Sequence, residues 1–135
     1  VRNDLVFPSV GDNLIRKKFV SLFENLGLNQ FIAIDPSAKV SKSVKLNSST
    51  YIGKNVIVNA QCEIGKGVIL NTSCIIEHEC NVSDFVHIAP SAVLCGNVSV
   101  GEESFVGANS VIRQNTTIND GIVIGAGSVV TLSVH

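Results

Sequence analysis

Residues 52–69 have the sequence IGKNVI VNAQCE IGKGVI, three segments of six residues that each begin with an aliphatic side chain. The same period of six runs without interruption from Ile34 to the end of the chain, with Ile, Val or Leu at every first position. The fifth position is always small or aliphatic, and the second is often Gly or Asn. An amphipathic helix has a period of 3.6 and an ordinary strand a period of 2, so neither explains a long run of sixes. The period indicates a repetitive, solenoid-like structure.

The hexapeptide period predicts a mainly β fold, a left-handed parallel β-helix of about 5.5 coils. Each six is expected to form a short strand and a corner, and three sixes close a triangular coil. Residues eighteen apart then lie directly above one another in parallel strands. First-position aliphatics are predicted to fill the interior, and Gly or Asn to adopt the special backbone angles at the corners. Cys62, Cys74 and Cys80 occupy fifth positions and are predicted to be small apolar fillers, although stacked Cys62 and Cys80 could also form a bridge.

The composition restricts the function classes. The net charge is −1 and no Lys/Arg run is present, which argues against nucleic acid or an anionic membrane as a partner. No apolar stretch approaches the roughly 18 residues of a membrane span, and no signal peptide is visible. Four cysteines without CxxC spacing indicate reduced thiols and a cytoplasmic protein. Because the chain starts with Val1, we expect it to be a piece of a longer protein.

Residues 1–33 lack the hexapeptide period and predict a strand at 5–7, a helix and a strand at 30–34. Asp12 or Asn13 is expected to cap the helix. Apolar residues recur at helical spacing before Gly27; they are Ile15, Phe19, Leu22, Phe23 and Leu26. We therefore divide the chain into residues 1–33, the remnant of an α/β substrate domain whose other strands lie upstream, and residues 34–135, the β-helix. The loop before the helix, at Gly11, is either a ligand contact or an ordinary capped turn.

His78 occupies the third position of its six, where the side chain points outward. Glu77 or Glu79 can accept a hydrogen bond from one ring nitrogen and raise the basicity of the other. Gly96 lies one coil above and leaves its backbone N–H approachable, and His87 supplies a second imidazole half a coil away. A base, an orienting carboxylate and a bare amide form an acyl-transfer site. The alternative is an exposed histidine without a role.

Two other chemistries fit the residues less well. A zinc site would need three converging imidazoles, and His135 lies far along the axis from the other two, so no metal is predicted. A cysteine nucleophile is not expected, because Cys80 points inward and Cys95 has no histidine beside it in the register. Direct attack on a thioester is the better prediction.

The run NTSCIIEHECNVSDFVHIAPSAVLCGNVSVGEESFVGANSVI (71–112), followed by IGAGSVV (124–130), resembles the bacterial hexapeptide-repeat sugar O-/N-acetyltransferases. The resemblance covers essentially the whole chain and is strongest to the sialic acid O-acetyltransferase and UDP-4-amino-sugar N-acetyltransferase branch. It implies an N-terminal α/β domain that binds the sugar. It also implies a β-helix that forms a homotrimer and binds acetyl-CoA between subunits.

The resemblance also implies roles for individual residues. It makes His78 the general base, Glu79 its orienting carboxylate and Gly96 the amide that meets the thioester carbonyl. The implied acetyl-CoA contacts are His87, Gly96, Ala108 and Ala126. The implied acceptor contacts are Asn71 and, in the stretch VGDN, Gly11.

We therefore expect an acetyl-CoA-dependent acetyltransferase acting on an amino or hydroxyl group of a sugar or sugar nucleotide in surface-glycan synthesis. Two features depart from the family: its N-terminal glycine-rich nucleotide loop is absent, and DPSA (35–38) replaces the common HPSA. The alternatives are a fragment unable to bind acceptor and a non-catalytic trimeric scaffold. An ice-binding surface fits less well, because the outward positions are mixed Lys, Asn, Glu and Ser rather than rows of Thr.

Overall fold

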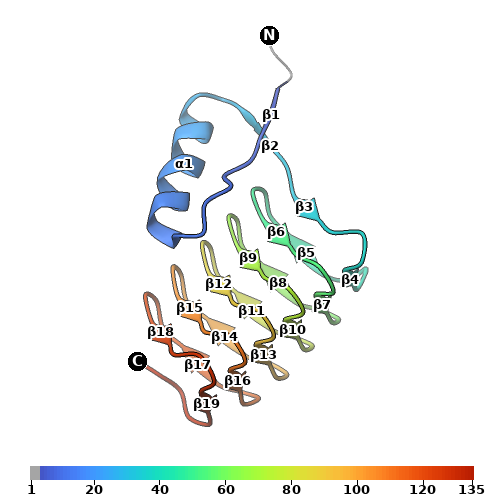
Figure 1. The fold of residues 1–135 in the computed structure, drawn as a ribbon, viewed down its shortest axis with the longest axis vertical. Helices are drawn as coiled ribbons and strands as arrows, with labels where there is room; N and C mark the ends of the chain where they lie inside the picture. The colour runs from blue at the N-terminus through green and yellow to red at the C-terminus, as the bar shows by residue number, and fades with distance from the viewer. Residues whose placement is uncertain (1–3) are drawn as a thin grey trace.

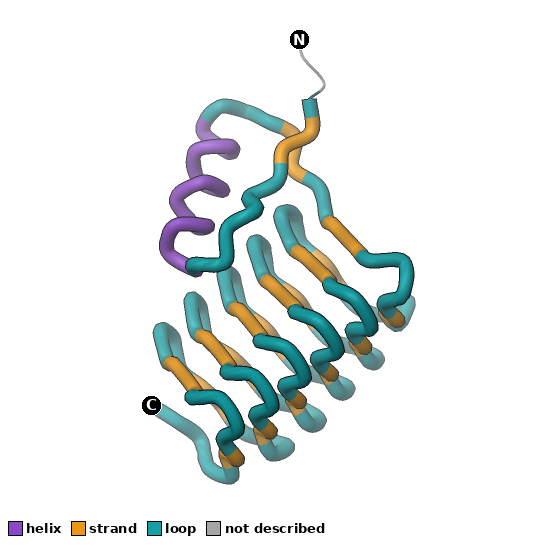
Figure 2. Tube along the Cα trace, viewed as in Figure 1, coloured by secondary structure: helices purple, strands orange, loops and turns teal. Residues whose placement is uncertain are grey.

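The computed structural model describes residues 4–135 and contains a parallel β-helix with a short N-terminal α/β segment beside it (Figure 1). Two-residue strands alternate with corners along the whole β-helix (Figure 2). The first sheet comprises β3 (Ala33–Ile34), β6 (Tyr51–Ile52), β9 (Ile69–Leu70), β12 (His87–Ile88), β15 (Phe105–Val106) and β18 (Val123–Ile124). The second comprises β4 (Lys39–Val40), β7 (Ile57–Val58), β10 (Ile75–Ile76), β13 (Val93–Leu94), β16 (Val111–Ile112) and β19 (Val129–Val130). The third comprises β5 (Lys45–Leu46), β8 (Glu63–Ile64), β11 (Asn81–Val82), β14 (Ser99–Val100) and β17 (Thr117–Ile118). The predicted left-handed β-helix is confirmed.

The register of the coils is the predicted one of eighteen residues. Ile75 pairs in parallel with Ile57 on one side and with Val93 on the other. First-position aliphatics such as Ile64 and Ile76 are completely buried in the interior. Since apolar burial drives folding, this continuous row of aliphatic side chains holds the coils together.

The corners correct one expectation about the glycines. The left-handed backbone conformation lies at the fourth position of the sixes, for example at Gly67 (φ 61°) and Glu79 (φ 61°), and not at the glycine-rich second position. A Cβ atom added to second-position Gly65 would lie 2.5 Å from Asp84 Oδ1. Gly65, Gly101 and Gly107 therefore serve close approach between coils, because a Cβ atom at these positions would collide with the next coil.

The N-terminal segment has β1 (Leu5–Val6) paired in parallel with β2 (Asn29–Gln30), with α1 (Asn13–Asn25) between them. The predicted Asp12 cap is confirmed, since the Ile15 N–H donates to Asp12 Oδ1 at 2.9 Å. β3 already belongs to the β-helix and spans the predicted boundary between residues 33 and 34, which stays a prediction.

The face of α1 that packs on the β-helix is not its apolar stripe. Arg16 and Val20 are buried there. The exposed stripe consists of Ile15, Phe19, Leu22 and Leu26. Arg16 Nε donates to Gly67 O at 2.6 Å and Arg16 Nη2 to Phe85 O at 3.0 Å, so the guanidinium fastens the helix to two neighbouring corners. Within residues 4–135, no helix is long and apolar enough to cross a membrane.

Candidate functional site

His78 and Glu79 lie in the corner that joins β10 to β11. Their side chains meet at 2.9 Å, from His78 Nδ1 to Glu79 Oε2, and both are more than half exposed. Because an ionised carboxylate only accepts hydrogen bonds, Nδ1 carries the proton and Nε2 presents a lone pair. Glu77 is turned away and accepts from Asn59 Nδ2 at 2.9 Å. Of the two flanking glutamates, only Glu79 orients the imidazole.

The backbone of Glu79 explains how two consecutive side chains can meet. Its φ of 61° is the left-handed conformation that L-residues other than Gly, Asn and Asp seldom adopt. The same conformation recurs at the fourth position of every six from Ser49 to Gly127, so the fold imposes it there whatever the residue. A glutamate placed there contacts the imidazole of the preceding residue, and the resulting pair can accept a proton at Nε2.

Gly96 lies directly against the His78 ring. A Cβ atom added to Gly96 would be 2.6 Å from His78 Cε1 and 2.7 Å from Nε2. The coils are tied together at this point by the Asn97 N–H, which donates to His78 O at 2.9 Å. Among residues 4–135 no group accepts a hydrogen bond from the Gly96 N–H. The base and an unused amide donor therefore share one corner.

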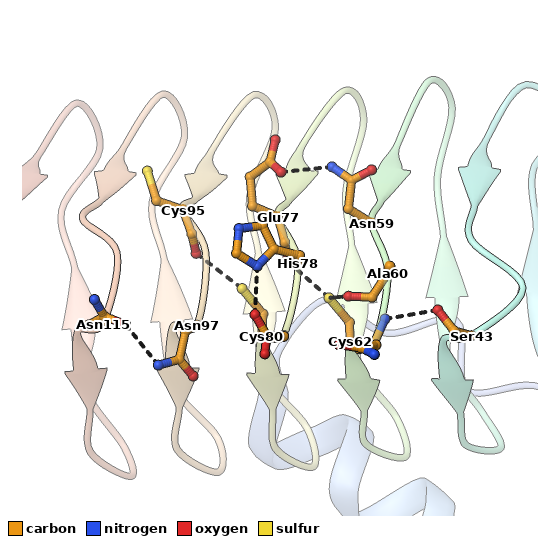
Figure 3. A network of polar contacts seen from close by, with 12 residues as sticks. Ser43, Asn59, Ala60, Cys62, Glu77, His78, Cys80, Cys95, Asn97 and Asn115 are labelled. Carbon is orange, nitrogen blue, oxygen red and sulfur yellow. Dashed lines mark hydrogen bonds and ion pairs between the residues drawn. The ribbon is translucent and has the colours of Figure 1, made fainter.

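A cleft of about 490 Å³ opens over this corner. Besides the predicted residues it is lined by Cys95, Asn97, Gln114 and Asn115. Asn97 Nδ2 donates to Asn115 Oδ1 at 2.8 Å, which forms a polar ladder along the cleft (Figure 3). Sequence reasoning missed these asparagines, although their spacing of eighteen residues from Glu79 is a signal that could have found them.

His87, Asn71 and Gly11 come together in a second place, a cavity of about 280 Å³ between the N-terminal segment and the first sheet. Asn71 Nδ2 lies 3.2 Å from His87 Nε2, and the His87 ring meets Phe105 edge-on with 5.0 Å between ring centroids. Burial lowers the pKa of His87 and the nearby Arg16 charge lowers it further, while a hydrogen bond to the Gly11 backbone raises it. His87 is therefore neutral at pH 7 and accepts from Asn71.

The same cavity contains residues that the sequence did not single out. They are Phe7, Pro8, Ser9, Val10, Arg16, Ser49, Tyr51 and Ile69. Tyr51 lies one coil before Ile69 and two coils before His87 in the first sheet. The eighteen-residue register could therefore have placed Tyr51 and Ile69 beside His87 from the sequence.

Ala108 and Ala126 form a third group, at the corners that follow β15 and β18. They are stacked, since the Gly127 N–H donates to Ala108 O at 2.7 Å, and Gly107 would meet Ala126 N at 2.5 Å if it carried a Cβ. Neither alanine lines the cleft at His78. The predicted site residues thus fall into three groups on different corners and faces of the triangular coil, and one chain alone does not unite them.

The four cysteines are free, and Cys62, Cys74 and Cys80 are buried as predicted. Cys95 stacks on Glu77 and Arg113 in the eighteen-residue register, so no histidine stands beside it there, but it lines the same cleft as His78. In the part of the chain described, 4–135, no group of three or more His, Cys, Asp or Glu side chains could hold a metal ion.

Comparison with known proteins identifies similar hexapeptide-repeat transferases. Residues 97–131 match the family model of the bacterial transferase hexapeptide (six repeats). A histidine-to-asparagine variant of perosamine N-acetyltransferase from Caulobacter crescentus, solved with CoA and GDP-perosamine, is 34% identical with a TM-score of 0.96. The alignment covers 97% of this chain and 62% of that one.

The acetyltransferase domain of PglB from Neisseria gonorrhoeae, in complex with acetyl coenzyme A, is 36% identical with a TM-score of 0.92. It aligns with 93% of this chain and 62% of its own length. WeeI from Acinetobacter baumannii shares the fold, with 18% identity and a TM-score of 0.63. That alignment covers 93% of this chain and 66% of the WeeI chain. Comparison with curated proteins gave no match. The chain spans about 62% of the length of the perosamine N-acetyltransferase and of the PglB acetyltransferase domain.

Proposed function

The chain carries the bacterial transferase hexapeptide repeat and shares its β-helix with solved sugar N-acetyltransferases, and we propose that it is itself an acetyl-CoA-dependent sugar acetyltransferase. The acceptor is an amino or hydroxyl group of a sugar or sugar nucleotide used in surface-glycan synthesis. One observation carries the proposal. The His78 imidazole is bonded to Glu79 at Nδ1 and packs against Gly96, whose N–H is unused by the described chain.

In the proposed reaction His78 Nε2 removes a proton from the acceptor as its nitrogen or oxygen attacks the thioester carbonyl. General base catalysis of this kind contributes about 10²–10⁴-fold. The Gly96 N–H donates to the oxyanion of the tetrahedral intermediate, and one such donor is worth about 10²–10³-fold. Glu79 stabilises the imidazolium. When the intermediate collapses, the CoA sulfur leaves and takes the proton from His78.

The separation of the three groups supports a homotrimer as the active form. A closed cyclic arrangement places a corner of one subunit against a different corner of the next, at three equivalent seams. Acetyl-CoA would lie in such a seam along Ala108 and Ala126, with His87 as a further contact. Asn71 and Gly11 would contact the acceptor. The free thiols fit a cytoplasmic enzyme.

Among acceptors, a nucleotide-linked amino sugar is favoured. The perosamine N-acetyltransferase was solved with GDP-perosamine, and 97% of the present chain aligns with that protein. GDP-perosamine and UDP-linked 4-amino sugars are therefore the first acceptors to offer, before sugars that present only hydroxyl groups.

The test begins with calorimetric titration of the chain with acetyl-CoA, beside His87→Ala. Micromolar binding of about one molecule per subunit, weakened in His87→Ala, is expected. Release of the CoA thiol in the presence of each acceptor is then compared in wild type, His78→Asn and the control His135→Asn. His78→Asn is expected to lose about 10²-fold or more of kcat and the control none.

The rival function is a trimeric scaffold without catalysis. A trimeric sample that binds no acetyl-CoA would establish the scaffold and exclude the acetyltransferase. A His78→Asn variant with the turnover of wild type would leave the acetyltransferase standing but exclude His78 as its general base. Binding of acetyl-CoA without turnover on any acceptor would instead indicate a chain that needs a further segment for its acceptor.

A further inference from the structure

Two buried thiols lie on the inner side of the His78 corner. Cys62 and Cys80 are at most 1% exposed and stack at the same fifth position of consecutive coils. Cys62 Sγ donates to Glu77 O at 2.9 Å, and Cys80 Sγ donates to Cys95 O at 3.2 Å (Figure 3). The carbonyls that accept these bonds immediately precede His78 and Gly96.

The position of each carbonyl matters because a peptide group is planar and trans. The Cys95 C=O and the Gly96 N–H belong to one peptide group and point in opposite directions. A carbonyl held inward by the Cys80 thiol therefore turns the Gly96 N–H outward, toward the side where the His78 ring lies. Cys80 thus fixes the direction of the amide that would receive the oxyanion.

This bond depends on the residue at the fifth position. Hydroxyl side chains make the same contact, fifteen residues ahead, elsewhere in the β-helix: Thr50 to Gly65 O at 2.8 Å and Ser104 to Asn119 O at 2.8 Å. An aliphatic side chain such as Val98, one coil above Cys80, has no donor to offer. A thiol at position 80 is therefore more than an apolar filler.

The thiol of Cys80 is protonated and able to donate. The neighbouring Cys62 thiol and burial both raise the pKa of Cys80 above its ordinary value. Cys80 therefore remains a thiol at neutral pH, with its proton available to the Cys95 carbonyl.

We propose that Cys80 is a positioning residue, which orients the Gly96 amide for the tetrahedral intermediate through its bond to the Cys95 carbonyl. The proposal rests on the proposed acetyl transfer. It differs from the filler role predicted by the hexapeptide pattern, under which Cys80 would affect stability alone.

The experiment compares Cys80→Ala, Cys80→Ser and the control Cys74→Ala. Cys74 is also completely buried at a fifth position, but within residues 4–135 its thiol makes no bond to a neighbouring coil. Both alanine variants remove one buried sulfur atom, and Cys80→Ala also removes the bond to the Cys95 carbonyl, so its melting temperature should fall at least as far as that of Cys74→Ala. Serine keeps a donor at position 80.

Three quantities are measured for each variant: kcat and KM for acetyl-CoA, the melting temperature, and the ¹⁵N chemical shift of Gly96. A hydrogen bond to a peptide carbonyl polarises that group and deshields its nitrogen, so the shift reports the Cys80 bond directly. Cys80→Ala is expected to lower kcat about 2- to 10-fold with unchanged KM and to move the Gly96 resonance upfield. Cys80→Ser restores both, and Cys74→Ala changes neither.

The inference is overturned if Cys80→Ala matches Cys74→Ala in kcat, or if the Gly96 resonance does not move. An unchanged resonance with lowered kcat would mean that Cys80 acts by another route, which also overturns it. A wild-type protein without acetyl transfer on any acceptor overturns the proposed function, and that result is distinct because it appears before any variant is compared.

Discussion

Replacing Gly96 with alanine should disable His78 without removing it. The added Cβ would lie 2.6 Å from His78 Cε1 and 2.7 Å from Nε2. Carbon atoms in contact are about 3.5–4.0 Å apart, so the imidazole has to retreat by about 1 Å. The Gly96 N–H is kept in this variant, because alanine has the same backbone donor.

The displaced group is the exposed end of a flexible side chain, so the fold should tolerate the substitution. We expect the free energy of unfolding to change by no more than about 0.5 kcal/mol. A displacement of about 1 Å in a catalytic group can cost about 10²-fold in rate, and kcat should fall by that order. Urea unfolding and release of the CoA thiol measure the two effects separately.

A double-mutant cycle with His78→Asn decides whether the loss acts through the histidine. If the clash is the cause, Gly96→Ala costs nothing further once His78 is absent. Additive losses in the double variant would refute the reasoning and assign the effect to the backbone at position 96.

Three further outcomes are expected. Glu79→Gln keeps a partner for His78 but removes the charge; because an exposed pair contributes at most about 1 kcal/mol, kcat should fall no more than about fivefold, and a hundredfold loss in steady-state assays would contradict this. Arg16→Leu leaves buried carbonyls without donors and should destabilise the docking of α1 by about 2–4 kcal/mol, seen as faster amide exchange in the helix than in the β-helix. The folded-state pKa of His87 lies below its ordinary 6.5, so the folded state binds fewer protons at this residue and the free energy of unfolding should fall as pH drops below about 6.5. In a plot of urea midpoint against pH, His87→Gln should lose the part of the decrease that His87 causes. Parallel plots for wild type and His87→Gln would count against this prediction.

The hexapeptide period by itself determined the β-helix and the stacking of residues eighteen apart. Because every coil consumes three sixes and pairs with the next through its backbone, the register follows from arithmetic and places Gly96 over His78. The Asp12 cap was likewise predictable, since capping depends on a few neighbouring residues.

Only the tertiary structure decided which way the side chains turn. Two features make Glu79 rather than Glu77 the partner of His78: the left-handed backbone at Glu79 and the hydrogen bond that Asn59 donates to Glu77. The hydrogen bond from Cys80 to the Cys95 carbonyl spans fifteen residues and so lies outside the eighteen-residue register. Burial of Arg16 in place of the apolar stripe of α1 was equally hidden, because it depends on carbonyls that two distant corners present. A period fixes the course of the backbone, whereas side-chain partners depend on corner dihedrals and on the neighbours that the folded chain brings within hydrogen-bond distance.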